Sequence, residues 1–249
     1  CLQEIKCREG EFPREIFAQM GLPHLKISGQ KGWHGVAIAS RLPIEDAPSL
    51  GVCREGHARC VSATVAGVEI QNFYIPAGGD IPERNLNPKF GQKLDFVARM
   101  TRWSEALRGP TILTGDFNIA PLECDVWSHK ALLDVVSHTP IEVEAMGRLQ
   151  AAHGWVDLGR SFIPAPERNF TWWSYRSKDW TANDRFPSGM VATARRIADA
   201  GFRPGLWLAP LIALPHSRFA REHPDLLVQD DAGRPLVTGT NWGAGYHSL

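Results

Sequence analysis

The chain has 249 residues, which is enough for one or two domains with a sizeable buried core. It carries 27 Lys and Arg against 27 Asp and Glu, so its net charge of zero excludes a strongly basic protein, although not a local basic groove. Hydrophobic residues make up 43% and charged residues 22%, the proportions of a globular protein, which excludes wholesale disorder.

The cysteines and the apolar segments indicate the cellular compartment in which the protein is expected. The five cysteines are odd in number and show no C-x-x-C spacing, which predicts reduced thiols in a cytoplasmic protein rather than a disulfide framework or zinc knuckle. The longest apolar run, Gly205 to Pro215, contains prolines and is about half of what spans a bilayer, so no membrane anchor is expected. Both ends, Cys1 and Leu249, are expected to be cut rather than natural.

Short apolar strands open the chain. Val36–Ser40 follows a glycine-rich turn and is predicted to be a buried strand. Arg59–Val65 and Val68–Tyr74 flank the dipeptide Ala66-Gly67, which is typical of a hairpin turn.

Helices follow these strands. A helix is predicted from Pro88 to about Leu107, because its apolar residues recur every three or four positions until Gly109-Pro110 stops it. Thr111–Asp116 is predicted to be a short buried strand, and about Ile141–Ala152 a second helix. Hairpin-joined strands with helices between them indicate the α+β class.

The last part of the chain has a different pattern. Ser188–Ala200 is predicted to be a helix, with Ser188 as N-cap and Gly201 beyond its end, and Pro204–Ala209 an apolar strand. A helix that leads through a short turn into such a strand is typical of an α/β barrel.

Three polar residues are candidates for metal and phosphate chemistry. Asp116 and Asn118 follow a buried strand and would lie on the same side of an extended chain. Asp can deprotonate a water and Asn can orient a phosphate, although an Asx turn is an equal alternative. Glu4 ends another apolar segment and is the kind of ligand that Mg²⁺ prefers, although a lone Glu is more often a surface residue.

Further residues suit a phosphate or a base. Tyr74 can donate a hydrogen bond to a phosphate at a strand end, or be a core tyrosine. Gln30 and Lys31 lie in a glycine-rich turn that either approaches a phosphate or is only a tight hairpin. Trp172 belongs to an aromatic run beside Arg176, which suits an unstacked base, the alternative being a Trp-rich core strand.

Taken in order, these segments resemble the exodeoxyribonuclease III type of the endonuclease/exonuclease/phosphatase family. The resemblance covers about residues 1–184, and its motifs are specific jointly rather than singly. They are Leu2-Gln3-Glu4, Gly29-Gln30-Lys31-Gly32-Trp33-His34-Gly35-Val36-Ala37, Asn72-Phe73-Tyr74-Ile75-Pro76, Gly115-Asp116-Phe117-Asn118-Ile119 and Thr171-Trp172-Trp173-Ser174-Tyr175-Arg176-Ser177.

The resemblance implies a fold, a reaction and a set of roles. The fold is a four-layer α/β sandwich, and the activity is Mg²⁺-dependent hydrolysis of DNA at abasic sites and from 3′ ends, with Mn²⁺ as a possible substitute. Glu4, Asp116 and Asn118 would form the metal site, with Tyr74, Asp116 and Asn118 as catalytic residues. Gln30, Lys31, Trp172 and Arg176 would contact double-stranded DNA, and a monomer is expected.

The sequence also departs from the family pattern. The family opens with a Thr-Trp-Asn-Val-Asn strand and closes with Leu-Asp-His and Ser-Asp-His motifs, and none of these occurs here. The first and last strands are therefore expected to be missing, and catalysis by this chain to be impaired.

The segment from about 179 to 249 resembles a piece of the α-galactosidase barrel of glycoside hydrolase family 36. It carries Gly201-Phe202-Arg203-Pro204-Gly205-Leu206-Trp207 and Asn241-Trp242-Gly243. The expected domains are therefore residues 1–184 and 185–249, the second with a risk of self-association. The alternatives to a DNA phosphodiesterase are an α-galactosidase-type hydrolase fragment and a non-catalytic chimera.

Overall fold

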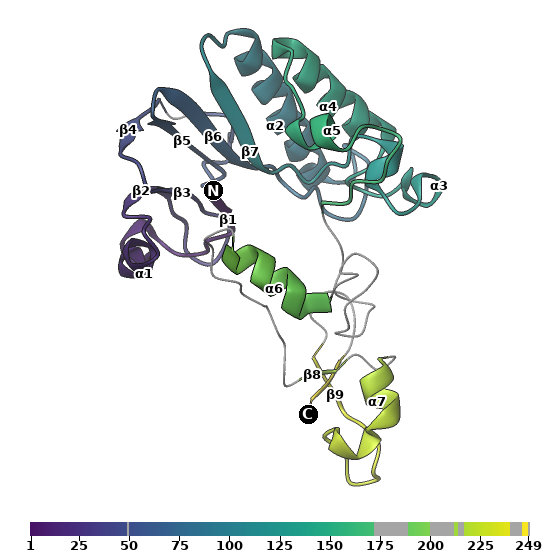
Figure 1. Ribbon diagram of the computed structural model, residues 1–249. Coiled ribbons are helices and arrows are strands. Elements are labelled where there is room, and N and C mark those ends of the chain that lie inside the picture. Colours follow the sequence, from purple (N-terminus) through teal and green to yellow (C-terminus); the bar gives the residue numbers. More distant parts are fainter. Residues whose placement is uncertain (49, 172–188, 200–211, 214–216, 240–245, 249) are drawn as a thin grey trace. The chain divides into compact units, whose positions relative to one another are not determined.

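A computed structural model of the protein describes residues 1–48, 50–171, 189–199, 212–213, 217–239 and 246–248 (Figure 1). The chain divides into two compact units, Cys1–Thr171 and Trp172–Leu249. The expected boundary at residue 184 lies outside the described residues and stays a prediction.

The first sheet of unit Cys1–Thr171 is antiparallel, with strand order β1-β3-β2. Its strands are β1 (Leu2–Gln3), β2 (His24–Ser28) and β3 (Val36–Ser40). Helix α1 (Arg14–Gln19) and the segment before it cover one face, where Phe12 and Phe17 stack and Phe12, Ile27 and Ala37 form a small core.

The second sheet has strand order β4-β5-β6-β7. Its strands are β4 (Ile44–Asp46), β5 (Cys60–Val65), β6 (Val68–Tyr74) and β7 (Thr111–Asp116). The first three are antiparallel, and the β5–β6 hairpin turns at Ala66 and Gly67, both with positive φ. β7 pairs with β6 in parallel, so the chain crosses over between them through a long helix.

Two long helices cover the outer face of this second sheet. They are α2 (Pro88–Glu105) and α4 (Pro140–His153), and each begins with a proline at its first turn. The main core lies between them and the sheet, with Phe73, Phe96 and Met100 fully buried, which removes large apolar surfaces from water.

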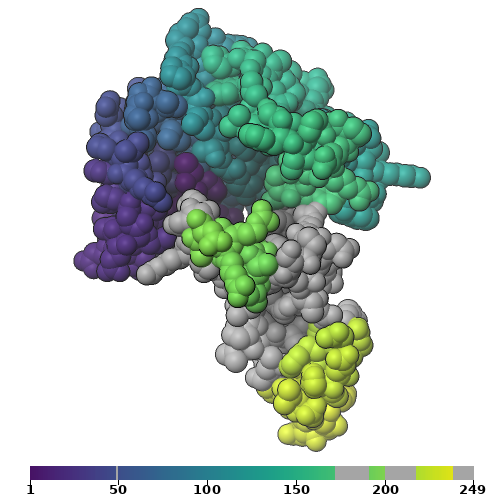
Figure 2. Space-filling view, viewed as in Figure 1, coloured from purple at the N-terminus to yellow at the C-terminus, as the bar shows by residue number. Residues whose placement is uncertain are grey.

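The two sheets also pack on each other. Because side chains alternate along a strand, Val36 and Ile38 of β3 face Val61 and Ala63 of β5, while Ala37 faces the α1 side. The layers are therefore helix, sheet, sheet and helices, which confirms the expected α+β sandwich. Figure 2 shows the purple N-terminal residues on one side of this unit and the teal residues, which include α2 and α4, on the other.

The predicted elements agree closely in position with the observed ones, but β7 ends the described sheet and none of its residues is fully buried, so its predicted burial is wrong. The strand at Val36–Ser40 is confirmed, and the expected helices differ from α2 and α4 by one or two residues at their ends. Short helical segments complete the described part of this unit. They are η1 (Glu9–Glu11), η2 (Glu123–Asp125), α3 (His129–Leu132) and α5 (Leu158–Phe162).

The second unit has a small sheet of its own. Its described elements are α6 (Gly189–Asp199), β8 (Ile212–Ala213), α7 (Arg218–Glu222), η3 (Pro224–Leu226), β9 (Val237–Gly239) and β10 (Tyr246–Ser248). The predicted helix over Ser188–Ala200 corresponds to α6, whereas the predicted strand Pro204–Ala209 lies outside the described residues. The strand order β8-β10-β9 is antiparallel, unlike the parallel strands of an α/β barrel. Among the described helices, none is both long and apolar enough to cross a membrane.

Candidate functional site

The ends of three strands bring the predicted site residues together. Tyr74 is the last residue of β6 and pairs in register with Asp116, the last residue of β7. Strand β1 lies across the sheet interface and delivers Glu4. Buried Asn72 of β6 fixes this crossing, because its amide donates to the carbonyls of Leu2 (2.9 Å) and Ala37 (3.0 Å).

Glu4 and Tyr74 are in direct contact. The Tyr74 hydroxyl donates a 2.6 Å hydrogen bond to Glu4 Oε1, and Lys6 Nζ lies 2.8 Å from Glu4 Oε2. The Glu4 backbone has φ 54°, a left-handed conformation that turns the chain at the end of β1. The carboxylate therefore meets one phenol and one ammonium group at the edge between the sheets.

The turn after β7 holds Asp116 and Asn118. Asp116 Oδ1 accepts the backbone N–H of Asn118 at 3.0 Å, which is the Asx turn considered from the sequence. The Asn118 amide donates to the carbonyl of Ile75 at 2.9 Å, so the turn is tied to the end of β6. Gly115 has φ 135°, and a Cβ there would lie 1.9 Å from Phe73 O, so only glycine fits.

A cationic and aromatic group surrounds Tyr74. The Arg59 guanidinium lies 4.9 Å from the centre of the Tyr74 ring, and its Nη1 donates to the Tyr74 carbonyl at 3.2 Å. The rings of His34 and Tyr74 are 6.1 Å apart, and those of His34 and His57 4.6 Å. Neither Arg59 nor His57 is predicted from the sequence to lie at this place.

The pKa values in the site shift in ways that the contacts explain. Burial would raise the pKa of Glu4, but the hydrogen bonds from Lys6 and Tyr74 outweigh it and lower the pKa. Burial raises the pKa of Asp116, and the charge of Glu4 raises it further. Burial and the bond to the Glu4 carboxylate raise the pKa of Tyr74, so its phenol stays protonated at neutral pH.

Histidine His34 has a pKa lowered to about 4 by burial, by Arg59 and by His57. This ring is therefore neutral at pH 7. Its left-handed φ of 58° is set by the turn, where Lys6 N–H donates to the His34 carbonyl at 2.9 Å.

The donor set suits a hard divalent cation. Glu4 and Asp116 supply carboxylate oxygens at one edge, and Mg²⁺ is commonly held by one or two carboxylates with water and substrate phosphate. Among the described residues, no group of three or more His, Cys, Asp or Glu side chains forms a metal cage. Two carboxylates fit an ion that completes its shell with water and phosphate.

The other residues predicted to contact DNA lie in different surroundings or outside the described residues. Gln30 is half-buried and its Oε1 accepts the Ala58 N–H at 2.9 Å, while Lys31 is exposed in the same turn. Trp172 and Arg176 lie outside the described residues. The DNA contacts assigned to all four residues stay predictions.

Lys93 and Glu142 are site-supporting residues that the sequence analysis missed. They form an ion pair with both side chains 0% exposed, between α2 and α4. The sequence spacing could have indicated Lys93, because this residue lies on the same helical face as Phe90 and Val97. A lysine on an apolar face indicates a buried charge with partners elsewhere in the fold.

The α-galactosidase resemblance of the last part of the chain also has a match among solved structures. TtGalA, the α-galactosidase of Thermus thermophilus, is 44% identical over 28% of this chain and 15% of that one, with a TM-score of 0.27. At that score the match carries no structural argument.

Comparisons with known proteins agree on the larger part. The exodeoxyribonuclease of Bacillus subtilis is 29% identical over 71% of this chain and 69% of its own length, and the zebrafish (Danio rerio) DNA repair nuclease APEX1 is 29% identical over 70% and 57%. A Neisseria 3′ phosphatase bound to a product DNA hairpin is 30% identical with a TM-score of 0.63, covering 71% of this chain and 68% of that one. The chain thus spans between 57% and 69% of the length of these relatives. Its residues 1–189 match the family model described as the Endonuclease/Exonuclease/phosphatase family, to which the chain therefore belongs.

Proposed function

We propose that this chain is a divalent-metal-dependent DNA phosphodiesterase of DNA repair, acting at abasic sites and 3′ ends. The observation that carries the proposal is the convergence of Glu4, Tyr74, Asp116 and Asn118 at the edge where β1, β6 and β7 end. Its relatives are hydrolytic nucleases, which supports this reaction class.

The residues divide the work by their chemistry. Glu4 and Asp116, with Asn118 beside them, would hold Mg²⁺ or Mn²⁺, which when bound supplies Lewis-acid stabilisation of the phosphate. Asp116 has a raised pKa, which suits a carboxylate that accepts the proton of an attacking water.

Two neutral donors would orient the phosphate. Tyr74 keeps its hydroxyl proton at neutral pH because its pKa is raised. The Asn118 amide has two N–H donors, and the Ile75 carbonyl accepts from this amide, which leaves a second N–H for a phosphate oxygen.

We propose that the rate is low for this polypeptide. The 249 residues contain no Asp-His dipeptide, whereas the family resemblance implies such histidines at the scissile phosphate. One lost electrostatic donor costs about 10²–10³-fold in rate.

The proposal extends to partner and compartment. Gln30 and Lys31, with Trp172 and Arg176, would contact double-stranded DNA outside the metal site. The five cysteines, all within the described residues, are free thiols, which supports a cytoplasmic protein. We expect a monomer, with residues 185–249 as the source of any self-association.

The test is cleavage of an end-labelled abasic-site duplex and a 3′-recessed duplex, with Mg²⁺, Mn²⁺ or EDTA. We expect slow, metal-dependent cleavage that Asp116→Asn abolishes and that Asp134→Asn, a change at an exposed loop residue, leaves intact. No cleavage with either metal, or equal cleavage by the Asp116→Asn protein, would overturn the proposal. Release of nitrophenol from a nitrophenyl α-galactoside would instead favour the glycosidase alternative.

A further inference from the structure

A fully buried ion pair lies behind the proposed active site. Lys93 on α2 and Glu142 on α4 face each other with side chains 0% exposed. Two charges taken out of water are costly unless additional hydrogen bonds satisfy their remaining protons and lone pairs. The partners of this pair therefore show what it holds in place.

The Lys93 ammonium joins the two loops that leave the site. Its Nζ donates to the carbonyl of Asn118 at 2.7 Å and to that of Ala77 at 3.1 Å, in addition to Glu142. An ammonium has three N–H donors, so all three are used. Ala77 lies in the loop that follows Tyr74, and Asn118 in the turn that contains Asp116.

Glu142 fixes the ammonium and the start of α4 together. Its oxygens accept the backbone N–H of Ser137 at 2.9 and 3.1 Å, and Oε2 accepts the hydroxyl of Thr139 at 2.6 Å. The Ser137 carbonyl in turn accepts the N–H of Ala120, in the chain just after Asn118. The turn after β7 is thus bound to this pair at two points, directly at Asn118 through Lys93 and at Ala120 through Ser137 and Glu142.

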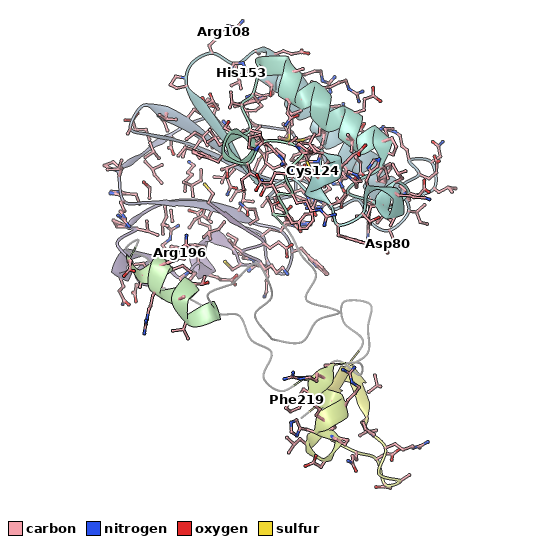
Figure 3. The ribbon with its side chains drawn as sticks, turned by 45° about the vertical axis from the view of Figure 1, so that its right-hand side comes forward. Asp80, Arg108, Cys124, His153, Arg196 and Phe219 are labelled. Carbon is pink, nitrogen blue, oxygen red and sulfur yellow. The ribbon has the colours of Figure 1, made fainter. Side chains whose placement is uncertain are left out.

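The loop after β6 is fitted closely around the lysine stem. Gly78 has φ 94°, and a Cβ there would lie 3.0 Å from Lys93 Cδ and from Val136 Cγ1. Figure 3 shows Asp80, in this loop, at the opposite end of the helical layer from Arg108, which follows α2. The lysine therefore acts at the end of the layer where β6 and β7 finish.

We propose that Lys93 and Glu142 are positioning residues for the active site, holding the Tyr74 strand end and the Asp116–Asn118 turn in one fixed arrangement. Neither residue touches the proposed substrate. The catalytic part of this inference rests on the proposed function. A misplacement of about 1 Å in a catalytic group can cost about 10²-fold in rate. Removing the Lys93–Glu142 pair is therefore expected to lower kcat.

The test replaces the pair without leaving a buried charge. The double variant K93M/E142L removes both charges, and apolar replacements of a buried pair are often neutral or stabilising. Here the carbonyls of Ala77 and Asn118 and the N–H of Ser137 also lose their partners, so Tm is expected to fall. In the folded variant we expect kcat lower by about 10²-fold and KM for the duplex changed by less than about 3-fold. The matched control on the same helix is E144Q/R148M, because this exposed i,i+4 pair should leave kcat unchanged. Wild-type kcat in a folded K93M/E142L protein would overturn the proposal.

A second readout does not depend on nuclease activity. The amides of Ile75 and Asn118 donate to Asp116 O and Oδ1, at 2.9 and 3.0 Å. In K93M/E142L, or in the isosteric E142Q if the double variant does not fold, hydrogen exchange at these two amides is expected to accelerate at least about tenfold, relative to β5 amides such as Val61. Unchanged hydrogen exchange at these two amides would refute the positioning role of Lys93 and Glu142. Accelerated exchange in a chain whose wild type cleaves no DNA would refute only the proposed function.

Discussion

The Tyr74 hydroxyl donates a 2.6 Å hydrogen bond to Glu4 Oε1, although the two residues are 70 positions apart in the chain. The contact depends on β1 crossing β6 at the sheet interface, where the side chain of Asn72 on β6 donates to the backbone carbonyls of Leu2 on β1 and Ala37 on β3. The contact makes the phenol a neighbour of the proposed metal ligand, and its single O–H would have to turn from Glu4 to donate to a phosphate.

Tyr74→Phe is therefore expected to affect both the Glu4 carboxylate and the proposed phosphate contact. Loss of the phosphate donor should lower kcat by about 10²-fold. The Tyr74 bond helps to lower the pKa of Glu4, so without it that pKa rises and Glu4 takes up a proton at a higher pH as the solution is acidified. The low-pH limit of Mg²⁺ activation should shift upward, as measured by Mg²⁺ titrations at several pH values. An unchanged limit would show that Glu4 does not sense the phenol.

Gly115→Ala tests the close approach of β7 to β6. A Cβ at this position would lie 1.9 Å from Phe73 O, at φ 135°. We expect a loss of about 3 kcal/mol or more in the free energy of unfolding, measured by urea denaturation. Gly109→Ala is the matched control, since its φ is also positive at 94° but nothing lies within 4 Å. Its loss should stay near 1 kcal/mol, and equal losses would mean that backbone strain alone, without the clash, is measured.

Asn72→Ala tests the link between the two sheets. Asn72 is 0% exposed, and its removal leaves the carbonyls of Leu2 and Ala37 without this donor. Buried groups left unsatisfied cost about 1–3 kcal/mol, so the unfolding free energy should fall by that amount. Exposed Asn85→Ala should change it by less than about 0.5 kcal/mol. If the two variants are equally stable, the Asn72 bridge contributes nothing.

His34→Asn tests the pH dependence of stability. The pKa of His34 falls from 6.5 to about 4 on folding, so the unfolded chain binds this proton first as pH decreases. The stability from this group is fully present above pH 6.5 and is lost as pH falls towards 4. Asparagine tolerates the left-handed φ of 58°, so the variant should fold and its Tm should decline less over that range. Parallel Tm curves for both proteins would exclude His34 as the titrating group.

Limited proteolysis tests the domain boundary. The two compact units meet between Thr171 and Trp172, and the family match ends at residue 189. We expect early cleavage between Asp184 and Gly189 and a resistant N-terminal fragment, identified by mass spectrometry. Uniform resistance across this joint with a single cooperative melt would show that both units share one core.

The local elements and the candidate site residues could be predicted from the order of the amino acids alone. The helix α2 was readable because its apolar residues follow the helical repeat, and the β5–β6 hairpin because of its turn at Ala66 and Gly67. The residue types of Glu4, Tyr74, Asp116 and Asn118 also indicated metal and phosphate chemistry. These signals are local, since they depend on backbone preference and on the repeat of neighbouring side chains.

Which of these residues come into contact depends on how the strands and helices pack together. The register of β6 with β7 sets Tyr74 beside Asp116, and the crossing of β1 brings Glu4 to the same phenol. The buried pair Lys93 and Glu142 joins two helices that lie far apart in sequence, and Arg59 lies over the Tyr74 ring. Such contacts follow from strand order, register and sheet packing, which are set by burial over the whole domain, so the local pattern around one residue does not specify its partner.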